Sequence, residues 1–156
     1  MPAVSTTHGD TEMAIENTRQ LVVFSLGSEE YAVPITRVQE IIDYVEPRSV
    51  ASESQWIQGV ISLRGKILPV WDLASRLGVG REAHGAGKIV IVETADDMAG
   101  IVVDDVEEVL TVDTDQVDDV PGAGADLIEA IAKVGDRLVI LLDLDGVFAG
   151  EAVLAG

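Results

Sequence analysis

The chain has 156 residues, of which 28 are acidic and 10 are Lys or Arg, so its formal net charge is −18 at pH 7. A surface this acidic argues against nucleic acid and an anionic membrane surface as the main partner, because both would repel it. Hydrophobic residues make up 47% of the chain, which is enough to build a core and excludes a wholly disordered protein.

Residues 1–19 are polar and contain no apolar segment of the kind that a signal peptide requires. We therefore predict a disordered N-terminal tail on a cytoplasmic protein. We also expect no insertion into a membrane, because no segment approaches the roughly 20 apolar residues that a span needs. The acidic residues are spread along the whole chain. This pattern fits either a salt-rich cytoplasm, where screening offsets self-repulsion, or an ordinary soluble acidic protein.

Residues 20–42 open an internal repeat. Shifted by 68 positions, they fall without a gap on residues 88–110. Both segments contain two alternating, β-branched runs that are separated by a polar turn, which is the pattern of a β-hairpin. Each segment ends in Val-x-Glu followed by two aliphatic residues, so Glu40 is matched by Glu108.

A second pair of similar segments follows, because residues 61–78 resemble residues 131–150. Each has a strand, a turn that contains Gly, a more apolar strand and then Asp-Leu. Asp favours the N-cap of a helix and Gly favours its C-terminal end. We therefore predict one short helix that begins after Asp72 and another that begins after Asp143, with Gly78 and Gly150 as the stops.

The repeats predict an all-β fold with short helices. We divide the chain into a first subdomain at 20–87, whose Gly-rich end at 78–87 is a linker, a second subdomain at 88–150 and a C-terminal tail at 151–156. About five short strands per repeat would leave exposed edges in a flat sheet, so we expect each repeat to close into a small barrel. One such barrel buries too little surface alone, so the two should pack side by side.

The sequence offers no evident site for catalysis, a metal or a cofactor. Residues 78–87 lack the spacing of a phosphate-binding loop, because Glu82 stands where its first Gly belongs. The acidic run at 113–124 has Val117 where a calcium loop requires a side-chain ligand. The two His residues lie in the tail and the linker, and the chain has no Cys. We therefore expect neither a metal ion nor a cofactor.

Residues 56–73 hold the most specific motif of the chain. Two apolar runs meet at Arg64-Gly65-Lys66, so two of the ten basic residues stand together at one hairpin tip. Charges at a tip can simply keep a turn soluble, with Gly65 at a position that requires positive φ. Arg is also the side chain best suited to bidentate bonds at an interface, and Trp56 and Trp71 flank this hairpin. The tip is therefore either a plain turn or a contact surface.

The segment G-V-I-S-L-R-G-K-I-L-P-V-W-D-L at 59–73 resembles the signature of the CheW family, the coupling proteins of chemotaxis arrays. Residues 21–33 and 38–42 match the opening segments of that family, and the likeness extends over about 20–150. Ser62 stands where the family usually has Asn. The resemblance implies two five-stranded, SH3-like barrels packed side by side, in a non-enzymatic adaptor that needs no cofactor.

The same resemblance implies two protein partners. Family members join the cytoplasmic tips of chemoreceptors to the regulatory domain of the histidine kinase CheA, so this protein would be recruited to membrane-associated receptor arrays. The receptor-binding residues that match the family are Arg64, Glu40, Ser62, Leu63 and Gly65. Glu40 would orient Arg64 by ion pairing. The kinase-binding face would include the exposed strand residues Val38, Gly59 and Val60.

Two other functions stay open on the sequence. A generic β-barrel module that binds a peptide or a small ligand should have an apolar pocket with a few convergent polar groups, and the sequence shows no sign of one. An enzyme could use acid pairs such as Asp104-Asp105, but neighbours on a strand point to opposite faces of the sheet. An adaptor needs only complementary exposed patches, so it is the leading hypothesis.

Overall fold

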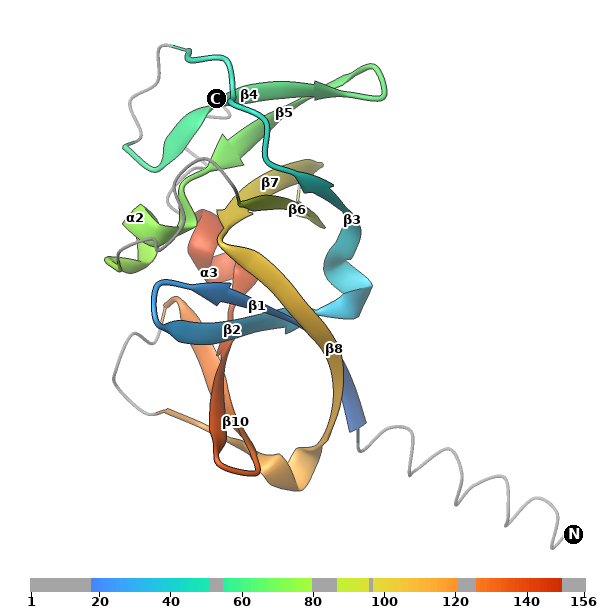
Figure 1. The fold of residues 1–156 in the computed structure, drawn as a ribbon, viewed down its shortest axis with the longest axis vertical. Helices are drawn as coiled ribbons and strands as arrows, with labels where there is room; N and C mark the ends of the chain where they lie inside the picture. The colour runs from blue at the N-terminus through green and yellow to red at the C-terminus, as the bar shows by residue number, and fades with distance from the viewer. Residues whose placement is uncertain (1–17, 51–54, 80–86, 96, 121–125, 150–156) are drawn as a thin grey trace, which may run out of the picture.

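The computed structural model of the protein describes residues 18–50, 55–79, 87–95, 97–120 and 126–149. The strands are β1 (Thr18–Leu26), β2 (Glu29–Pro34), β3 (Val38–Asp43), β4 (Ile57–Leu63), β5 (Lys66–Trp71), β6 (Lys88–Glu93), β7 (Met98–Val103), β8 (Asp105–Asp113), β9 (Val117–Asp118), β10 (Ile128–Val134) and β11 (Arg137–Leu142). The short helices are η1 (Ile35–Arg37), α2 (Leu73–Leu77), η2 (Thr114–Gln116) and α3 (Leu144–Phe148). This arrangement confirms the predicted all-β class with short helices (Figure 1).

Each of the two sheets takes strands from both repeats. Sheet A has six strands in the order β8-β1-β2-β11-β10-β9, and sheet B has five in the order β3-β6-β7-β5-β4. The β1–β2 hairpin of the first repeat therefore lies between β8 and β11 of the second repeat. In return, the β6–β7 hairpin of the second repeat lies between β3 and β5 of the first. The two repeats have exchanged their first hairpins.

The exchange overturns the predicted boundary between subdomains at 20–87 and 88–150, although the repeat itself is present. The first crossing between sheets follows β2. Pro34 ends this strand because it has no N–H to continue the ladder, and the single turn of η1 carries the chain into β3 of sheet B. The predicted barrels are therefore spatial units that are not contiguous in the sequence.

The second crossing between sheets lies at Asp104, between β7 of sheet B and β8 of sheet A. This residue is 8% exposed and is the one buried charged side chain among the described residues. Its backbone N–H donates to the carbonyl of Ser25, and its carboxylate accepts a hydrogen bond of 2.8 Å from the N–H of Gly27. The β1–β2 turn is thereby attached to the crossing point, so a buried polar group is satisfied where the ladder is interrupted.

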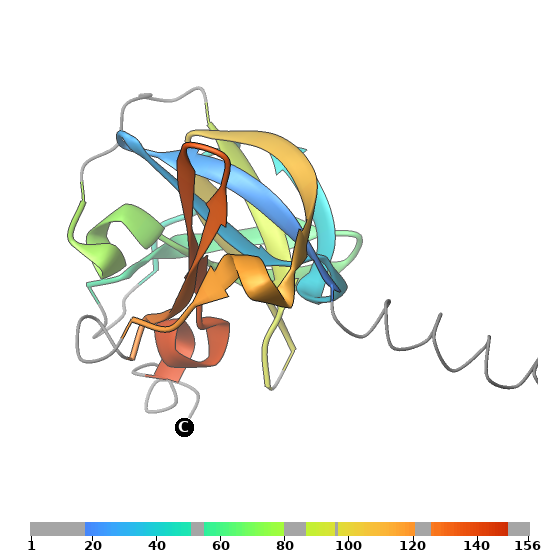
Figure 2. The same cartoon turned by 90° about the horizontal axis from the view of Figure 1, so that it is seen from below.

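Sheet B curls until the chain that follows its first strand, β3, meets its last strand, β4. In sheet B, the backbone of Arg48, just after β3, exchanges hydrogen bonds of 2.8 and 2.9 Å with Val60 of β4. In sheet A, the chain leaves the strongly curved β8 through η2, and β9 pairs with β10 (Figure 2). The expectation of two β subdomains side by side is confirmed, with β9 as a sixth, two-residue strand in sheet A.

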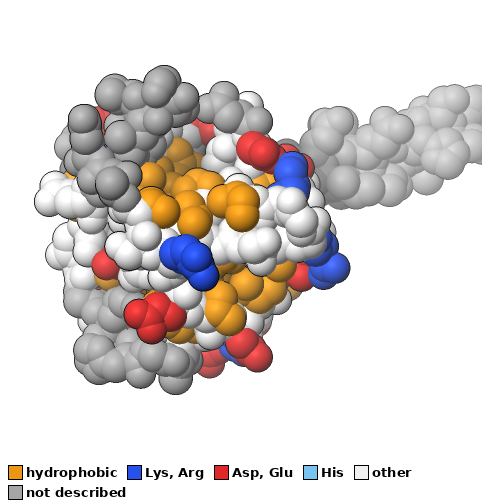
Figure 3. Space-filling model, turned by 90° about the horizontal axis from the view of Figure 1, so that it is seen from above, with side chains coloured by type: hydrophobic (Ala, Val, Ile, Leu, Met, Phe, Trp, Pro, Cys, Tyr) orange, Lys and Arg blue, Asp and Glu red, His pale blue; other side chains and the backbone are white. Residues whose placement is uncertain are grey.

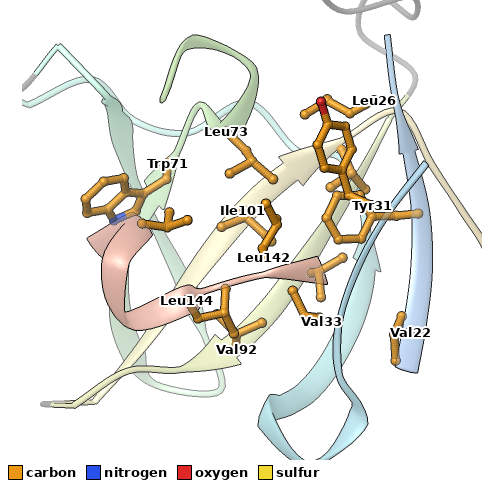
Figure 4. Close-up of a cluster of buried hydrophobic side chains, with 14 of the residues drawn as sticks. Val22, Leu26, Tyr31, Val33, Trp71, Leu73, Val92, Ile101, Leu142 and Leu144 are labelled. Carbon is orange, nitrogen blue, oxygen red and sulfur yellow. The ribbon is translucent and has the colours of Figure 1, made fainter. Parts of the chain in front are cut away.

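The largest hydrophobic cluster lies between the two sheets, as Figure 4 shows. Sheet A contributes Tyr31 and Leu142 to it, and sheet B contributes Val92 and Ile101, all of them buried. Two smaller clusters fill the interior of sheet A and of sheet B. Because the central cluster needs side chains from both sheets, neither sheet can complete its core alone.

Both predicted helices begin where the sequence indicates. The carboxylate of Asp72 accepts a hydrogen bond from the N–H of Ser75, and that of Asp143 accepts one from Gly146, so both Asp residues are N-caps. Gly78 ends α2 with a φ of 76°, as expected of a left-handed C-cap. The other predicted stop, Gly150, lies outside the described residues, and α3 ends at Phe148.

The predicted N-terminal tail at 1–19 is two residues too long, because Thr18 and Arg19 belong to β1. Residues 1–17, most of the predicted linker (80–86) and the predicted C-terminal tail (151–156) lie outside the described residues. None of the described helices combines the length and the apolar character needed to cross a membrane.

Candidate functional site

The tip of the β4–β5 hairpin is a two-residue turn made by Arg64 and Gly65. Their φ angles are 53° and 84°, so both central residues adopt the positive φ that a type I′ hairpin turn requires. Gly tolerates this conformation, as the sequence predicted for Gly65. Arg64 is the only non-glycine residue with positive φ in the described part of the chain. For a residue with a Cβ this backbone conformation costs about 1 kcal/mol.

Arg64 and Glu40 form a two-point ion pair. The Nε of Arg64 donates to Oε1 of Glu40 at 3.1 Å, and a terminal nitrogen donates to Oε2 at 2.7 Å. The side chain of Arg64 is 74% exposed, whereas that of Glu40 is 28% exposed. The hydrogen bond from Arg64 lowers the pKa of Glu40 below its ordinary value. The ion pair that we expected is therefore present, and it presents a fixed guanidinium to solvent.

The pair sits at one end of the sheet B barrel. Glu40 lies opposite Ile91 in the β3–β6 ladder, and the side chain of Ile91 belongs to the cluster inside sheet B. Because side chains alternate along a strand, Glu40 points to the same side as that cluster and lies at its rim. A guanidinium from the hairpin tip can reach this carboxylate only because the sheet curls back on itself.

A shallow depression lies beside the tip. Its lining residues are Gln39, Lys66, Glu93, Thr94, Asp97 and Met98. Most of these are polar, and they bond one another: Lys66 pairs with Asp97 at 3.0 Å, and Gln39 donates to Glu93. This lining differs from the apolar pocket that a small organic ligand usually requires.

The other predicted receptor-binding residues occupy two environments. Ser62 and Gly65 are exposed beside Arg64, whereas Leu63 is half-buried and packs against the cluster inside sheet B. Sequence reasoning missed Ile67, which lies opposite Ser62 in the ladder and is 65% exposed. The alternation along β5 was the available signal, because Leu68 and Val70 point inward.

Hydrophobic side chains gather around isolated basic side chains on the end of the molecule that carries β4 and β5 (Figure 3). The large exposed hydrophobic residues of β3, β5 and the segment after β3 are Ile41, Val45, Val50 and Ile67. A surface of this kind, with apolar side chains beside a few charges, is typical of a protein–protein contact.

The three residues predicted for an exposed kinase-binding face are less exposed than expected. Gly59 is buried, and a Cβ at this position would lie 2.2 Å from the carbonyl oxygen of Arg48, so the expectation that it is exposed is wrong. Val38 and Val60 are half-buried. Gly59 instead lets the backbone of Arg48 approach β4 and close the barrel. A kinase contact at Val38 and Val60 stays a prediction.

Neither tryptophan is an exposed anchor. Trp71 is 2% exposed and meets Phe148 edge to face at 4.8 Å, in the core between the sheets. Trp56 is half-buried, and the guanidinium of Arg76 lies 5.4 Å from the centre of its ring. Arg76 also donates to the carbonyl of Val147, so it ties α2 to α3. Both indole rings therefore serve packing.

Sheet A contains a second hairpin arginine that sequence reasoning missed. Arg137 begins β11 and bonds two carboxylates, Glu108 at 2.6 Å and Glu30 at 3.0 Å. Its side chain is only 37% exposed. The signal for this site was the repeat, which matches Glu108 with Glu40. Among the described residues, no three His, Asp or Glu side chains gather in a way that could hold a metal ion.

Two curled β-sheets around a shared core, with an ion-paired arginine at the tip of one hairpin, define a small all-β domain of two interlocked barrels. The family model of the CheW-like domain matches residues 20–152. The chain therefore belongs to the family of CheW-like domains.

Known relatives cover most of the chain. It is 31% identical over 138 residues to the chemotaxis protein CheW of Klebsiella aerogenes, a match that spans 85% of this chain and 83% of that protein. It is 32% identical over 143 residues to the chemotaxis protein CheW of Bacillus subtilis, spanning 88% and 92%. Among solved structures, the scaffolding protein TtCheW of Thermoanaerobacter tengcongensis superposes with a TM-score of 0.78 at 35% identity, over 83% of this chain and 92% of that one.

Proposed function

We propose that this protein is a non-enzymatic chemotaxis adaptor. It couples the cytoplasmic tips of chemoreceptors to the regulatory domain of the histidine kinase CheA, and it works in the cytoplasm on membrane-associated receptor arrays. Membership of the CheW-like family supports this function, as do relatives that are named chemotaxis proteins and a scaffolding protein. No cofactor is needed, because the work consists of binding two partners at once.

The observation that carries the proposal is the exposed Arg64 at the hairpin tip. A plain turn would take Gly or Asn at this position, since both tolerate positive φ at lower cost. The chain instead places a long cationic side chain there and fixes it with Glu40. A residue that is kept in a costly conformation is a sign of a functional constraint. Contact with a partner supplies that constraint.

The residues around Arg64 offer a receptor two kinds of contact, polar and apolar. Ser62 and Gly65 leave the backbone of the tip accessible, and the exposed Ile67 offers apolar area on the adjoining strand. An ion pair that is exposed contributes little, but the same charges count for more once a partner excludes water. The receptor contact therefore gains most of its strength from burying the tip.

The alternative of a ligand-binding barrel module has less support. The depression beside the tip is lined mainly by polar side chains that already bond one another. A ligand would have to break those bonds and would find little apolar surface in exchange. A protein partner that covers the whole tip avoids that cost.

The test is co-sedimentation of the purified protein with receptor signalling tips and, separately, with the regulatory domain of the kinase. We expect the native protein to bind both, and Arg64→Ala to lose receptor while it keeps the kinase domain. Arg19→Ala is the matched control, because Arg19 is another exposed, ion-paired arginine but lies on sheet A. Binding to neither partner by the native protein would overturn the proposal.

A further inference from the structure

The ladder of sheet B is interrupted directly before the carboxylate that holds Arg64. The pairing of β3 with β6 shifts by one residue between Val38 and Glu40, so Gln39 is an extra residue on β3. An extra residue of this kind is a β-bulge, which bends the strand and redirects the side chain next to it. The bulge therefore determines whether Glu40 faces the rim of the barrel, where Arg64 reaches it.

Sheet A has the same bulge 68 positions further along the chain. The pairing of β8 with β1 shifts by one residue between Val106 and Glu108, so Glu107 is the extra residue there. Glu108 is the carboxylate that pairs with Arg137. Each sheet therefore has a β-bulge directly before the glutamate that forms an ion pair with an arginine.

The two bulges differ in the contacts that hold them. Glu93 is the last residue of β6, and its carboxylate accepts a hydrogen bond from the side chain of Gln39. The carbonyl of Glu93 also accepts hydrogen bonds of 2.8 and 3.1 Å from Arg37, at the entry to β3. The equivalent residues of sheet A are Glu107, Ser25 and Asp105. In the part of the chain that the structure describes, no side-chain bond joins Glu107 to Ser25.

A bulge that nothing holds can move along its strand. If the bulge of sheet B moved on by one residue, Gln39 would take the place of Glu40 opposite Ile91, and Glu40 would no longer face the rim. Arg64, whose side chain is 74% exposed, would then lose the carboxylate that fixes its direction. The bonds to Glu93 oppose this shift, because they hold Gln39 beside the end of β6.

We propose that Gln39 and Glu93 are positioning residues of the receptor-binding surface, which hold the bulge in place and thereby fix the direction of Arg64. This inference rests on the proposed function and adds to it two residues that need not touch the receptor. They act through Glu40, which follows the bulge and accepts both hydrogen bonds from Arg64. A guanidinium that is ordered before the partner arrives loses less freedom on contact, so binding is tighter.

The first test exchanges the two bonded side chains. Gln39→Glu places two carboxylates side by side and breaks the bond, so we expect binding to receptor tips to weaken about fivefold, the cost of ordering one side chain on contact. Gln39→Glu combined with Glu93→Gln has the native net charge and makes the same bond with donor and acceptor exchanged. This double variant should bind within about twofold of the native protein. Thermal unfolding establishes that both variants are folded.

A second measurement separates positioning from direct contact with the receptor. In Gln39→Ala, the pKa of Glu40 should rise toward its ordinary value, because the hydrogen bond from Arg64 that lowers it is no longer fixed. The order parameter of Arg64 Nε, from nitrogen NMR relaxation, should fall in the same variant. Glu107→Ala truncates the equivalent residue of sheet A, so it is the matched control and should change neither quantity.

Binding to receptor tips is then compared between Gln39→Ala and Glu107→Ala, and we expect only Gln39→Ala to weaken it. If Gln39→Ala weakens binding but leaves Glu40 and Arg64 unchanged, Gln39 touches the receptor directly and the inference is overturned. It is also overturned if Gln39→Ala binds as the native protein does, or if the folded double variant binds no better than Gln39→Glu. The adaptor function stands in all three cases. Failure of the native protein to bind receptor tips would overturn the proposed function instead, and the pKa of Glu40 would still test the role of the bulge.

Discussion

Glu40 and Glu108 lie 68 positions apart, and each forms an ion pair with an arginine from a hairpin of its own sheet, β4–β5 for Glu40 and β10–β11 for Glu108. The arginines themselves are not equivalent, because Arg64 belongs to the β4–β5 turn and Arg137 is the first residue of β11. Each sheet thus contains a Glu–Arg ion pair, but the arginine stands at a different point of the hairpin in each sheet. One pair is enclosed by a second carboxylate, and the other faces solvent.

The backbone at position 64 should be strained. Arg64→Gly removes the cost of positive φ, whereas Arg64→Ala keeps it, and both lose the same ion pair. We therefore expect the glycine variant to have the larger free energy of unfolding, by about 1 kcal/mol. Urea denaturation measures the difference. Equal stability of the two variants would mean that the turn relaxes when the arginine is removed.

The ion pair should be visible in the titration of Glu40. Because the hydrogen bond from Arg64 lowers its pKa, Arg64→Ala should raise the pKa of Glu40 toward the ordinary value. NMR titration of the side-chain carboxyl carbon reports this directly, with Arg19→Ala as the control. A pKa of Glu40 that does not move in Arg64→Ala would show that the pair is absent in solution.

The same shift sets the sign of a pH effect on stability. The pKa of Glu40 is lower in the folded than in the unfolded state. The ion pair therefore stabilises the fold fully at pH values above the pKa of the unfolded state, which is about 4.3. This contribution is lost as the pH falls through the lowered pKa of the folded state. Glu40→Gln should therefore lower stability at pH 7 but not at a pH well below that pKa. Thermal unfolding at low ionic strength tests this, and an equal loss at both pH values would contradict it.

The close approach of β4 to the chain after β3 requires Gly59. A Cβ there would lie 2.2 Å from a backbone oxygen of Arg48, so Gly59→Ala must push the backbone away and weaken the Arg48–Val60 bridge. We expect a loss of about 1–3 kcal/mol in the free energy of unfolding. Ser62→Ala, an exposed position on the same strand, should change stability little. Similar effects of the two substitutions would show that the bridge is unimportant.

The hairpin exchange predicts that the two repeats cannot fold separately. Cutting the chain between residues 83 and 84 leaves each half with a hairpin whose neighbouring strands lie on the other half. Each fragment alone should give the narrow amide NMR spectrum of an unfolded chain, and the mixture should regain the native spectrum. A native-like spectrum from either fragment alone would contradict the observed topology.

The sequence predicts those parts of the fold that depend on local patterns. The alternation of apolar and polar residues predicts the hairpins. Asp72 and Asp143 are predicted as helix N-caps because each precedes an apolar run. Gly65 predicts the turn at the hairpin tip. The pairing of the hairpins was not predictable, because both repeats have the same alternation and each first hairpin suits either barrel. Pro34 and Asp104 mark the crossings, but each also fits an ordinary turn.

At the candidate site, the sequence motif predicts which residues pair with one another better than it predicts which of them are exposed. The Arg64–Glu40 pair was expected from the family resemblance and is present. The burial of Gly59 was not expected, since it depends on the backbone of Arg48 approaching from a segment outside the motif. Arg137 was missed because its partner Glu30 lies in the exchanged hairpin, more than a hundred residues away in the chain.

The central claim is that the protein bridges two partners, and one measurement tests it most directly. Receptor tips are sedimented with the kinase regulatory domain in the absence of this protein, in its presence, and with Arg64→Ala. We predict that kinase domain appears in the pellet only with the native protein, because each partner binds a different surface. Kinase domain that pellets equally without the protein, or stays in solution when the native protein is present, would contradict the adaptor function.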